Sequence, residues 1–359
     1  MYLNYIPVSD GRPRILVVRL GAMGDIIHTL PAVADLRAAA PDAHIVWAVD
    51  RRWMPILEGN PAIDRAIPVS LRRLRRFWFR QGSWRTAKGL AQRLRAMDLD
   101  LALDFQGLIK SALIANLSGA RCVAGFEPTL LREPPAGLLY NRLASSSAAH
   151  VVDRYRGLAA FASGRPNPGP AVFLLPRGKR SAGLPKRFVL ASPQAGWGHK
   201  EWPVRHFSEL ASRIWDTHRV PLVADCIPGR ERVAEEIRRS APYGAVIPHP
   251  STLEELIGAT RAAEAVVGVD SGPLHLAAAL GKPGIAIFGP TDPGRNGPYG
   301  TGIAVIRNPD ARTSYRRHRG HSDAMEACSP AMVHEVLAAI LSSSRSRPLP
   351  IDSDDGIQD

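Results

Sequence analysis

Residues 14–31 read RILVVRLGAMGDIIHTLP, and this stretch decides the fold. Its first part is a short run rich in Val, Ile and Leu, which is typical of a strand buried on both faces. Two glycines three residues apart, Gly21 and Gly24, follow the run and allow a tight turn before a helix. The turn lacks the GxGxxG pattern, so it gives little support to a dinucleotide site. The sequence predicts a helix that opens at Asp25, with Pro31 either kinking it or starting a new one.

Runs of the same kind recur along the chain and alternate with segments long enough for helices. They lie at Arg14–Leu20, His44–Asp50, Leu99–Phe105, Arg121–Phe126, Phe188–Ser192, Val220–Asp225, Ala245–Pro248, Ala265–Asp270 and Gly284–Gly289. The stretches Val204–Thr217 and Gly229–Arg239 are amphipathic, which suits helices that connect parallel strands. This alternation predicts the α/β class, with parallel sheets covered by helices on both faces.

The segment from Ser163 to Pro185 separates two halves of similar size, and nine of its 23 residues are Pro or Gly. Such a composition is typical of a linker. We therefore expect an N-terminal domain at 1–170, a linker at 171–187 and a C-terminal domain at 188–341. Residues 342–359 are rich in Ser, Pro and Asp, which predicts a disordered tail. Ligands bind at the carboxyl ends of such strands, so two facing domains would form a cleft for two substrates.

The composition limits the class of protein. The chain has 359 residues, 45% of them hydrophobic, which suits two domains of about 150 residues and excludes a disordered protein or a coiled-coil rod. Lys and Arg outnumber Asp and Glu by 46 to 33, which favours anionic partners. Cys122, Cys226 and Cys328 are too few and too far apart for a disulfide framework. With neither a long apolar run nor a signal-peptide pattern, we expect a soluble protein in a reducing compartment.

The most basic stretch lies between Leu71 and Met97, where nine residues are basic and none is acidic. The basic residues are Arg72, Arg73, Arg75, Arg76, Arg80, Arg85, Lys88, Arg93 and Arg95, and Phe77, Trp78, Phe79 and Trp84 lie among them. Most charge runs are solvated surfaces. A stretch of this length also suits the phosphates of a nucleic acid, or an anionic lipid head group with the aromatic side chains at the membrane interface.

Asp25 stands where the first strand turns into its helix, and two interpretations stay open. An Asp at the start of a helix caps free N–H groups. A carboxylate at the carboxyl end of a strand also faces the cleft, where a general base belongs. The sequence makes Asp25 a candidate for either role.

A first candidate for an anion site in the second half follows the strand at Phe188–Ser192. A loop of small residues leads there to Lys200 and to a helix that starts near Pro203. Loop N–H groups and a lysine charge at a helix entry suit a phosphate. Lys200 can equally be a surface lysine, and Trp202 is better explained as core packing than as a stacking platform.

A second candidate follows the strand that ends at Asp270. The N–H groups of Ser271 and Gly272 stand at the start of a helix, which also suits an anion. His275 lies one turn further and can reach the same anion. Asp270 and Ser271 can instead be plain helix caps, and His275 can be a buried structural histidine.

The sequence predicts no metal site and no cofactor. Asp98-Leu99-Asp100 matches a DxD pattern, but it precedes its strand and therefore lies at the edge of the sheet away from the cleft. No group of His and carboxylate residues has the spacing of metal ligands.

Four motifs come in the order seen in the ADP-heptose:lipopolysaccharide heptosyltransferases, and the chain resembles that family, glycosyltransferase family 9, from about Arg14 to Tyr299. They are MGDIIHTLP at 23–31, KEWP at 200–203, DSGPLH at 270–275 and GPTDP at 289–293. Within the family it most resembles the heptosyltransferase I group. That likeness rests on the basic and aromatic run, DFQGLIKS at 104–111, REP at 132–134 and YNR at 140–142.

The resemblance implies the GT-B fold, with two Rossmann-like domains that face a central cleft. It implies an inverting transfer without a metal, from ADP-L-glycero-D-manno-heptose to a Kdo sugar of lipid A. It also implies an enzyme of lipopolysaccharide inner-core synthesis, cytoplasmic and peripheral on the inner membrane. Nucleic acid is then not expected as a partner.

The resemblance also implies roles for single residues. Asp25 matches the general base of the family. Donor-binding positions match Lys200, Asp270, Ser271, Gly272 and His275, with Glu231 near a glutamate that holds the ribose and with Ala195 and Gly196 offering backbone N–H groups to phosphate. The acceptor, which carries carboxylates and phosphates, matches Arg72, Arg73, Arg75, Arg76, Lys110, Arg132 and Arg142.

Such a transfer needs one base to take the proton of the acceptor hydroxyl as the new bond forms. Lys200 and the helix start at Ser271 would stabilise the charge of the departing ADP without a metal. Two other functions stay open: a transferase of the same fold with another nucleotide sugar or acceptor, and a non-catalytic basic protein that binds nucleic acid.

Overall fold

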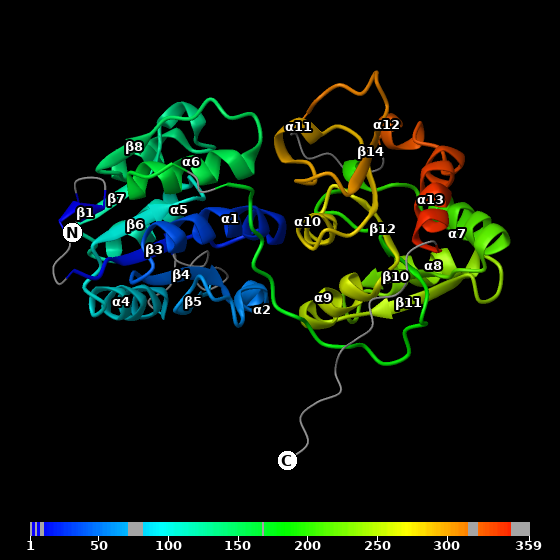
Figure 1. Ribbon diagram of the computed structural model, residues 1–359, viewed down its shortest axis with the longest axis horizontal. Helices are drawn as coiled ribbons and strands as arrows, with labels where there is room; N and C mark the ends of the chain where they lie inside the picture. Colours follow the sequence, from blue (N-terminus) through cyan, green and yellow to red (C-terminus); the bar gives the residue numbers. More distant parts are fainter. Residues whose placement is uncertain are drawn as a thin grey trace, which may run out of the picture.

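The computed structural model of the chain describes residues 2–3, 6–7, 11–70, 82–166, 169–314 and 322–345. Two six-stranded parallel sheets dominate the described part, one in each half of the chain, and Figure 1 shows them side by side. A short antiparallel hairpin of β1 (Tyr2–Leu3) and β2 (Ile6–Pro7) precedes them. The two halves have the GT-B architecture of two facing doubly wound domains, as predicted.

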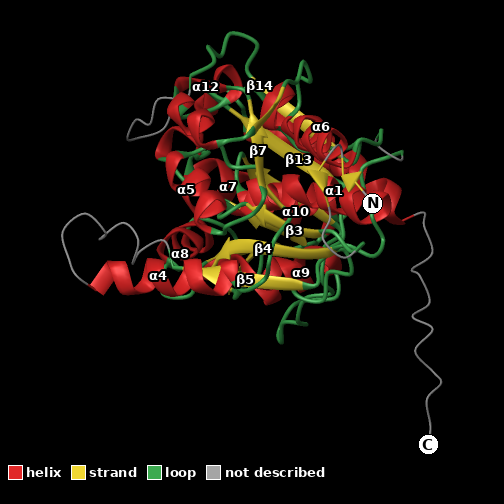
Figure 2. Cartoon of the chain, turned by 90° about the vertical axis from the view of Figure 1, so that its left-hand side faces the viewer, coloured by secondary structure: helices red, strands yellow, loops and turns green. Residues whose placement is uncertain are grey.

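The first sheet has the strand order β5-β4-β3-β6-β7-β8, and all its neighbouring strands run parallel. Its strands are β3 (Arg14–Val18), β4 (His44–Asp50), β5 (Arg65–Val69), β6 (Leu101–Asp104), β7 (Cys122–Phe126) and β8 (Arg142–Ala144). Ile15 to Val18 of the central strand are fully buried, because helices cover both faces of the sheet. Figure 2 shows α4 and α5 on one side of this sheet and α1 and α6 on the other.

The second sheet repeats the same order as β11-β10-β9-β12-β13-β14. Its strands are β9 (Val189–Ser192), β10 (Leu222–Cys226), β11 (Val246–Pro250), β12 (Ala265–Val269), β13 (Gly284–Phe288) and β14 (Ile303–Arg307). In both sheets the strand order reverses beside the first strand, at β3/β6 and at β9/β12. Ligands of open α/β sheets bind at these points, so the order alone fixes where a site can form.

Helices connect the strands in both halves. In the first half they are α1 (Met23–Ala39), α2 (Met54–Leu57), α4 (Gly82–Arg95), α5 (Ile109–Leu117) and α6 (Val151–Ser163), with 3-10 turns η1 (Arg51–Trp53), η2 (Pro128–Leu130) and η3 (Pro134–Leu139). In the second they are η4 (Gly198–Lys200), α7 (Val204–His218), α8 (Arg232–Arg239), α9 (Leu253–Ala262), α10 (Gly272–Ala279), α11 (Pro293–Asn296), α12 (Asp323–Glu326) and α13 (Pro330–Arg345). Figure 1 shows α10 and α9 towards the first half and α7 and α13 on the far side.

Three strands of the two large sheets do not follow from the sequence pattern: β5, β8 and β14. All three lie at the edge of a sheet, where one side of the strand has no partner. β5 contains Pro68, which is tolerated at an edge, and Val305 of β14 is 43% exposed. β8 has only three residues, two of them exposed. These three edge strands therefore lack the continuous apolar run by which the central strands are recognised, whereas β11, at the remaining edge, does follow from the run at Ala245–Pro248.

α1 is one continuous helix with Pro31 inside it, so the alternative of a second helix starting at Pro31 is wrong. The remaining turns stay helical because α1 is packed on nearly all sides. Ile26, Ile27 and Leu30 are at most 1% exposed. Packing of the apolar side chains outweighs the one backbone hydrogen bond that a proline removes.

The connection between the halves runs from Gly164 to Phe188, and its described residues form neither helix nor strand. It contacts both halves. Asn60 Nδ2 donates to the Leu174 carbonyl at 2.8 Å, and Lys179 N donates to Glu254 O at 2.8 Å. We keep the domain limits 1–170 and 188–341 and the linker 171–187 as a proposal. α13 extends to Arg345, four residues into the segment expected to be a tail, and the rest of 342–359 lies outside the described residues.

Candidate active site

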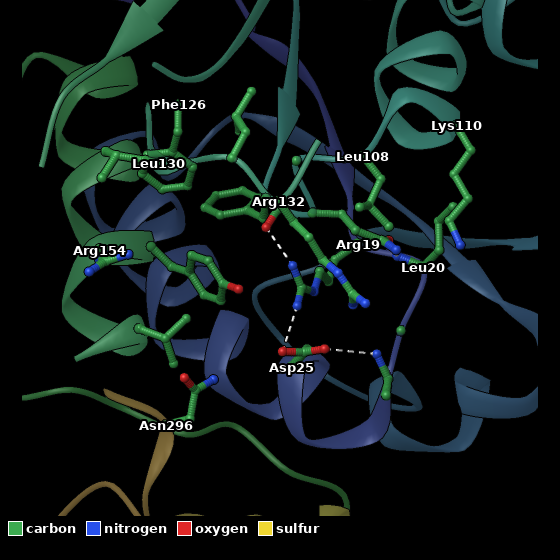
Figure 3. Close-up of a pocket in the computed structure, with 18 of the residues that line it drawn as sticks. Arg19, Leu20, Asp25, Leu108, Lys110, Phe126, Leu130, Arg132, Arg154 and Asn296 are labelled. Carbon is green, nitrogen blue, oxygen red and sulfur yellow. Dashed lines mark hydrogen bonds and ion pairs between the residues drawn. The ribbon is translucent and has the colours of Figure 1, made fainter. Parts of the chain in front are cut away.

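A cavity of about 570 Å³ opens at the carboxyl end of the first sheet, next to the point where the strand order reverses. Its lining includes Arg19, Leu20, Asp25, Arg52, Trp53, Gln106, Leu108, Lys110, Phe126, Leu131, Arg132, Arg154, Tyr155, Arg295 and Asn296. Arg295 and Asn296 belong to α11 of the second half, so both halves contribute to this cavity. Figure 3 shows Asp25 at its floor, with Arg19 above it and Arg132 and Lys110 towards its rim.

Asp25 is both a helix cap and a cavity-lining carboxylate, so its capping role leaves the carboxylate available as a candidate base. It occupies the third position of α1, and Oδ2 accepts a hydrogen bond from Ala22 N at 3.0 Å. Oδ1 lies 2.7 Å from NH2 of Arg19. About a third of its side chain is exposed, and it lines the cavity. Each oxygen is thus held by one donor, and the carboxylate keeps access to a ligand.

Arg19 is a residue of this site that the sequence reasoning missed. It follows β3 and is 5% exposed. NH1 donates to the Phe105 carbonyl at 2.5 Å, and the guanidinium lies 5.2 Å from the centre of the Tyr155 ring. Burial alone would lower the pKa of Arg19, but Asp25, Tyr155 and Asp104 together outweigh it and raise that pKa. An arginine at the end of an otherwise apolar strand is the signal that could have indicated its role.

The cavity wall is strongly basic. Lys110 and Arg132, both predicted to bind the acceptor, line it. The cavity is also lined by three arginines that the sequence analysis did not single out, namely Arg52, Arg154 and Arg295. Arg142 begins the edge strand β8 and is not among the lining residues. The predicted acceptor residues Arg72, Arg73, Arg75 and Arg76 lie outside the described residues.

At the carboxyl end of the second sheet, Asp270 gathers several polar side chains. One oxygen, Oδ2, pairs with Nζ of Lys200 and accepts from Oγ1 of Thr291 at 2.7 Å. Oδ1 lies 3.6 Å from Nε2 of His275. Burial alone would raise the pKa of Asp270, but His275 and Lys200 outweigh it and hold that pKa well below its usual range. Lys200 is therefore part of a buried ionic cluster and not a freely solvated surface lysine.

The start of α10 presents an unused hydroxyl. Ser271 is the residue before the helix, yet its side chain makes no capping hydrogen bond, and its buried Oγ has no partner among the described residues. Gly272 follows as the first helical residue. Free N–H groups at a helix start, an unpaired hydroxyl and the nearby Lys200 together suit an anionic group.

The other predicted donor residues lie at the same edge of the second sheet. The Ala195 N–H, expected to meet phosphate, donates to Oε1 of Glu201 at 3.2 Å, so a phosphate would have to replace this bond. Gly196 follows it in the same loop. Glu231 stands before α8, and its Oε1 accepts from the Gly229 N–H at 2.6 Å. Trp202 is a core residue, as expected, with Nε1 donating to the Cys328 carbonyl at 2.7 Å.

The two halves meet where α1 and α10 begin. A Cβ atom on Gly24 would lie 2.5 Å from Cδ2 of His275, and one on Gly272 would lie 2.7 Å from Cβ of Met23. Only glycine permits so close an approach. Because Asp25 follows Gly24 and Ser271 precedes Gly272, this contact brings the candidate base and the candidate anion site to one junction.

Three histidines lie at this junction. The ring centre of His28 is 4.4 Å from that of His275 and 5.6 Å from that of His150. His28 is 3% exposed, and neither of its ring nitrogens has a partner among the described residues. Burial and the neighbouring histidines hold the pKa of His28 well below its usual range, so the ring is neutral. His150 Nε2 lies 3.1 Å from the Gly297 carbonyl, which links the two halves.

The acidic pair Asp98 and Asp100 lies at the opposite edge of the first sheet. Both make ion pairs with Arg121, and Asp98 also pairs with Arg14. Across the described ranges, no group of three or more His, Cys, Asp or Glu residues is arranged to hold a metal ion. Within the same ranges no helix is long and apolar enough to cross a bilayer.

Comparisons with known proteins agree with this geometry. The family model of glycosyltransferase family 9 (heptosyltransferase) matches residues 88–324. Lipopolysaccharide heptosyltransferase 1 of Pseudomonas aeruginosa is 37% identical over 303 residues, which cover 80% of this chain and 81% of that relative. The relative of the same name in Escherichia coli K12 is 34% identical over 304 residues, covering 82% and 94% of the two chains.

Solved structures give the same result. The E. coli heptosyltransferase WaaC with ADP has a TM-score of 0.77 at 28% identity, with 91% of this chain and 99% of that chain covered. The same enzyme with ADP-2-deoxy-2-fluoro heptose has a TM-score of 0.75 at 28% identity, with the same coverage. The fold, the two facing sites and these similarities lead to one conclusion: the chain belongs to glycosyltransferase family 9, the heptosyltransferases.

Proposed function

We propose that this heptosyltransferase moves L-glycero-D-manno-heptose from ADP-heptose to a Kdo residue of Kdo-lipid A, with inversion and without a metal ion. The observation that carries this proposal is the junction at α1 and α10. There Gly24, the neighbour of the cavity-lining Asp25, packs against His275, which belongs to the buried cluster around Asp270 and Lys200. A base in one half and an anion site in the other are the two parts that an inverting transfer needs.

Asp25 is the general base in this proposal. As the bond forms between the acceptor oxygen and the anomeric carbon, Asp25 takes the hydroxyl proton and the bond to ADP breaks. Arg19 and the Ala22 N–H hold the carboxylate in place from two sides. A positioned base typically accelerates such a step about 10²–10⁴-fold. Arg19 is the positioning residue, since it acts through Asp25 and holds the carboxylate in place.

The donor diphosphate belongs at the start of α10. Ser271, Gly272 and Lys200 offer a hydroxyl, backbone N–H groups and a positive charge. His275 adds a ring nitrogen, Nδ1, that is buried without a hydrogen bond in the described part of the chain. These groups are fixed before the reaction, so they stabilise the charge of departing ADP at no cost of reorganisation. Glu231 would hold the ribose of the donor, and the backbone N–H groups of Ala195 and Gly196 would add hydrogen-bond donors to its phosphates. The relative from E. coli, solved with ADP and with a fluorinated ADP-heptose, supports this assignment.

The acceptor belongs in the basic cavity of the first half. A Kdo sugar carries a carboxylate and lipid A carries phosphates. The arginines and the lysine that line the cavity match these charges: Arg52, Lys110, Arg132, Arg154 and Arg295. The basic run with Arg72, Arg73, Arg75 and Arg76, together with Arg142, would extend this surface. A volume of about 570 Å³ is in the range of small-molecule sites.

The proposed acceptor is anchored in a bilayer, so the enzyme would work at a membrane surface. We propose a location in the cytoplasm with peripheral contact to the cytoplasmic face of the inner membrane. The formal charge of +13 favours attraction to an anionic leaflet. The activity would serve the synthesis of the lipopolysaccharide inner core.

The test is a transfer assay with Kdo-lipid A and a panel of donors, namely ADP-heptose and several UDP-sugars, with and without EDTA. We expect transfer from ADP-heptose alone, at a rate that EDTA leaves unchanged. Transfer from a UDP-sugar would identify a related transferase with another donor, and loss of activity in EDTA would refute the metal-free mechanism. Absence of transfer together with salt-dependent DNA binding would favour the nucleic-acid alternative.

A further inference from the structure

α5 carries an apolar stripe on its exposed face. Ile109, Leu113 and Leu117 are 41%, 46% and 40% exposed, and their spacing of four residues places them in one line along the helix. The other exposed residues of α5 are Lys110 and Asn116, so this face has no acidic side chain. Aliphatic side chains scattered singly over a surface need no explanation, but a line of three on one helix does.

The stripe continues onto the neighbouring turn η3. Leu138 of η3 is 88% exposed. Two hydrogen bonds tie this region to α5: Ile109 N donates to Oε2 of Glu133 at 2.8 Å, and Asn116 Nδ2 donates to the Leu139 carbonyl at 2.6 Å. The two segments are therefore one fixed surface, with exposed leucines on both.

Basic residues border this apolar surface. Nε of Arg95, at the end of α4, donates to the Leu117 carbonyl at 3.2 Å, so α4 lies directly beside α5. Figure 2 shows both helices on the same side of the first sheet. Four residues of α4 are basic and none is acidic. Lys88 and Arg93 are exposed on that helix. A line of aliphatic side chains with cations beside it is the pattern of a surface that lies on an anionic bilayer.

The surface begins at the rim of the cavity. Leu108 and Lys110 line the cavity, and Ile109 between them is the first residue of the stripe. Figure 3 shows Leu108 and Lys110 on the side of the cavity opposite Asn296. Leu130, Leu131 and Phe126 add apolar lining on the same half. An acceptor whose sugar reaches Asp25 could keep its lipid part in a bilayer that touches α5.

From these observations we infer that the face formed by Ile109, Leu113, Leu117 and Leu138, bordered by α4, is the surface by which the protein docks on an anionic lipid bilayer. The inference deepens the proposed function and rests on it only for the nature of the acceptor. A nucleic acid would match the cations but not the exposed leucines, because phosphate backbones are bound by charge. A bilayer matches both, since aliphatic side chains enter the boundary between head groups and acyl chains.

The experiment measures co-sedimentation of the full chain with vesicles of phosphatidylcholine, with and without phosphatidylglycerol. The test variant carries Leu113→Ser and Leu117→Ser, and a second variant carries Leu138→Ser. The matched control carries Tyr243→Ser and Met332→Ser, two exposed apolar residues of the second half. We expect the wild type and the control to bind anionic vesicles, and the α5 variant to bind about tenfold more weakly. Thermal unfolding of each variant checks that the fold is kept.

A charge variant tests whether the basic residues of α4 contribute to vesicle binding. Lys88→Gln with Arg93→Gln should weaken binding to anionic vesicles and leave binding to pure phosphatidylcholine unchanged. The inference is overturned if the wild type does not bind vesicles, if the α5 variant binds as well as the control, or if the α5 changes alter only the oligomeric state.

A paired activity assay separates this inference from the proposed function. On Kdo-lipid A embedded in vesicles the α5 variant should lose rate, and on a soluble Kdo acceptor without acyl chains it should keep the wild-type rate. If no Kdo acceptor is used by any form of the protein, the proposed function fails, while the vesicle result still decides the docking surface.

Discussion

The carboxylate of Asp25 shows how one side chain serves the fold and the site together. It completes a capping interaction with Ala22 and pairs with the buried Arg19, while it still lines the cavity. The cap fixes the start of α1, and the start of α1 fixes where the carboxylate points. A residue that only capped the helix would not need a buried guanidinium beside it.

Removal of Arg19 should lower the rate without weakening donor binding. In Arg19→Met the carboxylate loses the partner 2.7 Å from Oδ1, so we expect kcat to fall about 10- to 100-fold and the KM for ADP-heptose to stay constant. Arg19→Lys keeps a charge and should recover part of the rate. Steady-state kinetics of both variants, with thermal midpoints beside them, make the measurement. If both variants lose kcat equally, and only as far as their thermal midpoints fall, Arg19 has a purely structural role.

Lys200 should act on the donor alone. In Lys200→Gln the charge near the diphosphate is lost, and Asp270 stays buried with one cation fewer. We expect the KM for ADP-heptose to rise about 10- to 100-fold while the KM for the acceptor is unchanged. Lys186→Gln, a change of an exposed lysine before β9, is the control. A donor KM equal to that of the control would remove Lys200 from the donor site.

The sequence could predict those candidate site residues that follow a strand, in the loop or the first helical turn after it, and lie within two residues of a glycine. Asp25, Lys200, Asp270 and Ser271 all satisfy this condition, and the structure places them at the carboxyl edges of their sheets. Arg52 and Arg154 could not be found in this way. They enter the cavity from segments distant in sequence, and nothing in their neighbours distinguishes them from the other arginines of the chain.

At the scale of the elements, the contact between α1 and α10 is the feature on which the site depends. Gly24 and Gly272 let the two helix starts approach until no further carbon atom fits between them. The central strands could be predicted, because burial on both faces demands continuous Val, Ile and Leu. The edge strands β5, β8 and β14 could not, because a strand with one unpaired side needs no continuous apolar run.

A methyl group at Gly24 should separate the two helices. In Gly24→Ala the new Cβ would lie 2.5 Å from the His275 ring, so we expect the free energy of unfolding to fall by about 1–3 kcal/mol and the rate of transfer to fall with it. Gly157→Ala on α6 is the matched control, because no atom lies within 4 Å of its added Cβ. The control should gain about 0.5–1 kcal/mol of stability. Urea unfolding measures both, and equal stability of the two variants would contradict the close approach.

At the scale of the whole molecule, buried histidines link the two halves and make their stability depend on pH. His28 lies between the halves with its pKa well below the usual value. Below pH about 6.5 the unfolded chain therefore binds a proton at this residue that the folded chain does not. The stability contribution of His28 is present above that pH and is lost as the pH falls.

Urea unfolding between pH 7.5 and 5 tests this dependence, because this range spans the usual titration of histidine. We expect the free energy of unfolding to fall on acidification, with His28 contributing up to about 1.4 kcal/mol per pH unit. His28→Leu should flatten the slope, and His44→Gln, a change of a half-exposed histidine at the far edge, should not. If the free energy of unfolding of His28→Leu falls with pH as steeply as that of the wild type, another group causes the loss of stability at acidic pH.

In the proposed function the two halves divide the chemistry between them, with the acceptor cavity largely in the first half and the donor site in the second. Their similar size and their α/β class follow from the sequence rhythm, but their repeated strand order and the way they face each other do not. That arrangement rests on particular contacts, such as His150 with Gly297 and Tyr299 with Asp153, whose partners lie nearly 150 residues apart. No local pattern encodes contacts of that range.

The most direct test of the account replaces the base by its uncharged isostere. For Asp25→Asn we measure kcat for heptose transfer to Kdo-lipid A and, separately, the Kd for ADP-heptose by calorimetry. The account predicts a kcat lower by about 10²–10⁴-fold and a donor Kd within about twofold of the wild-type value. A variant that keeps most of the wild-type kcat would contradict the account.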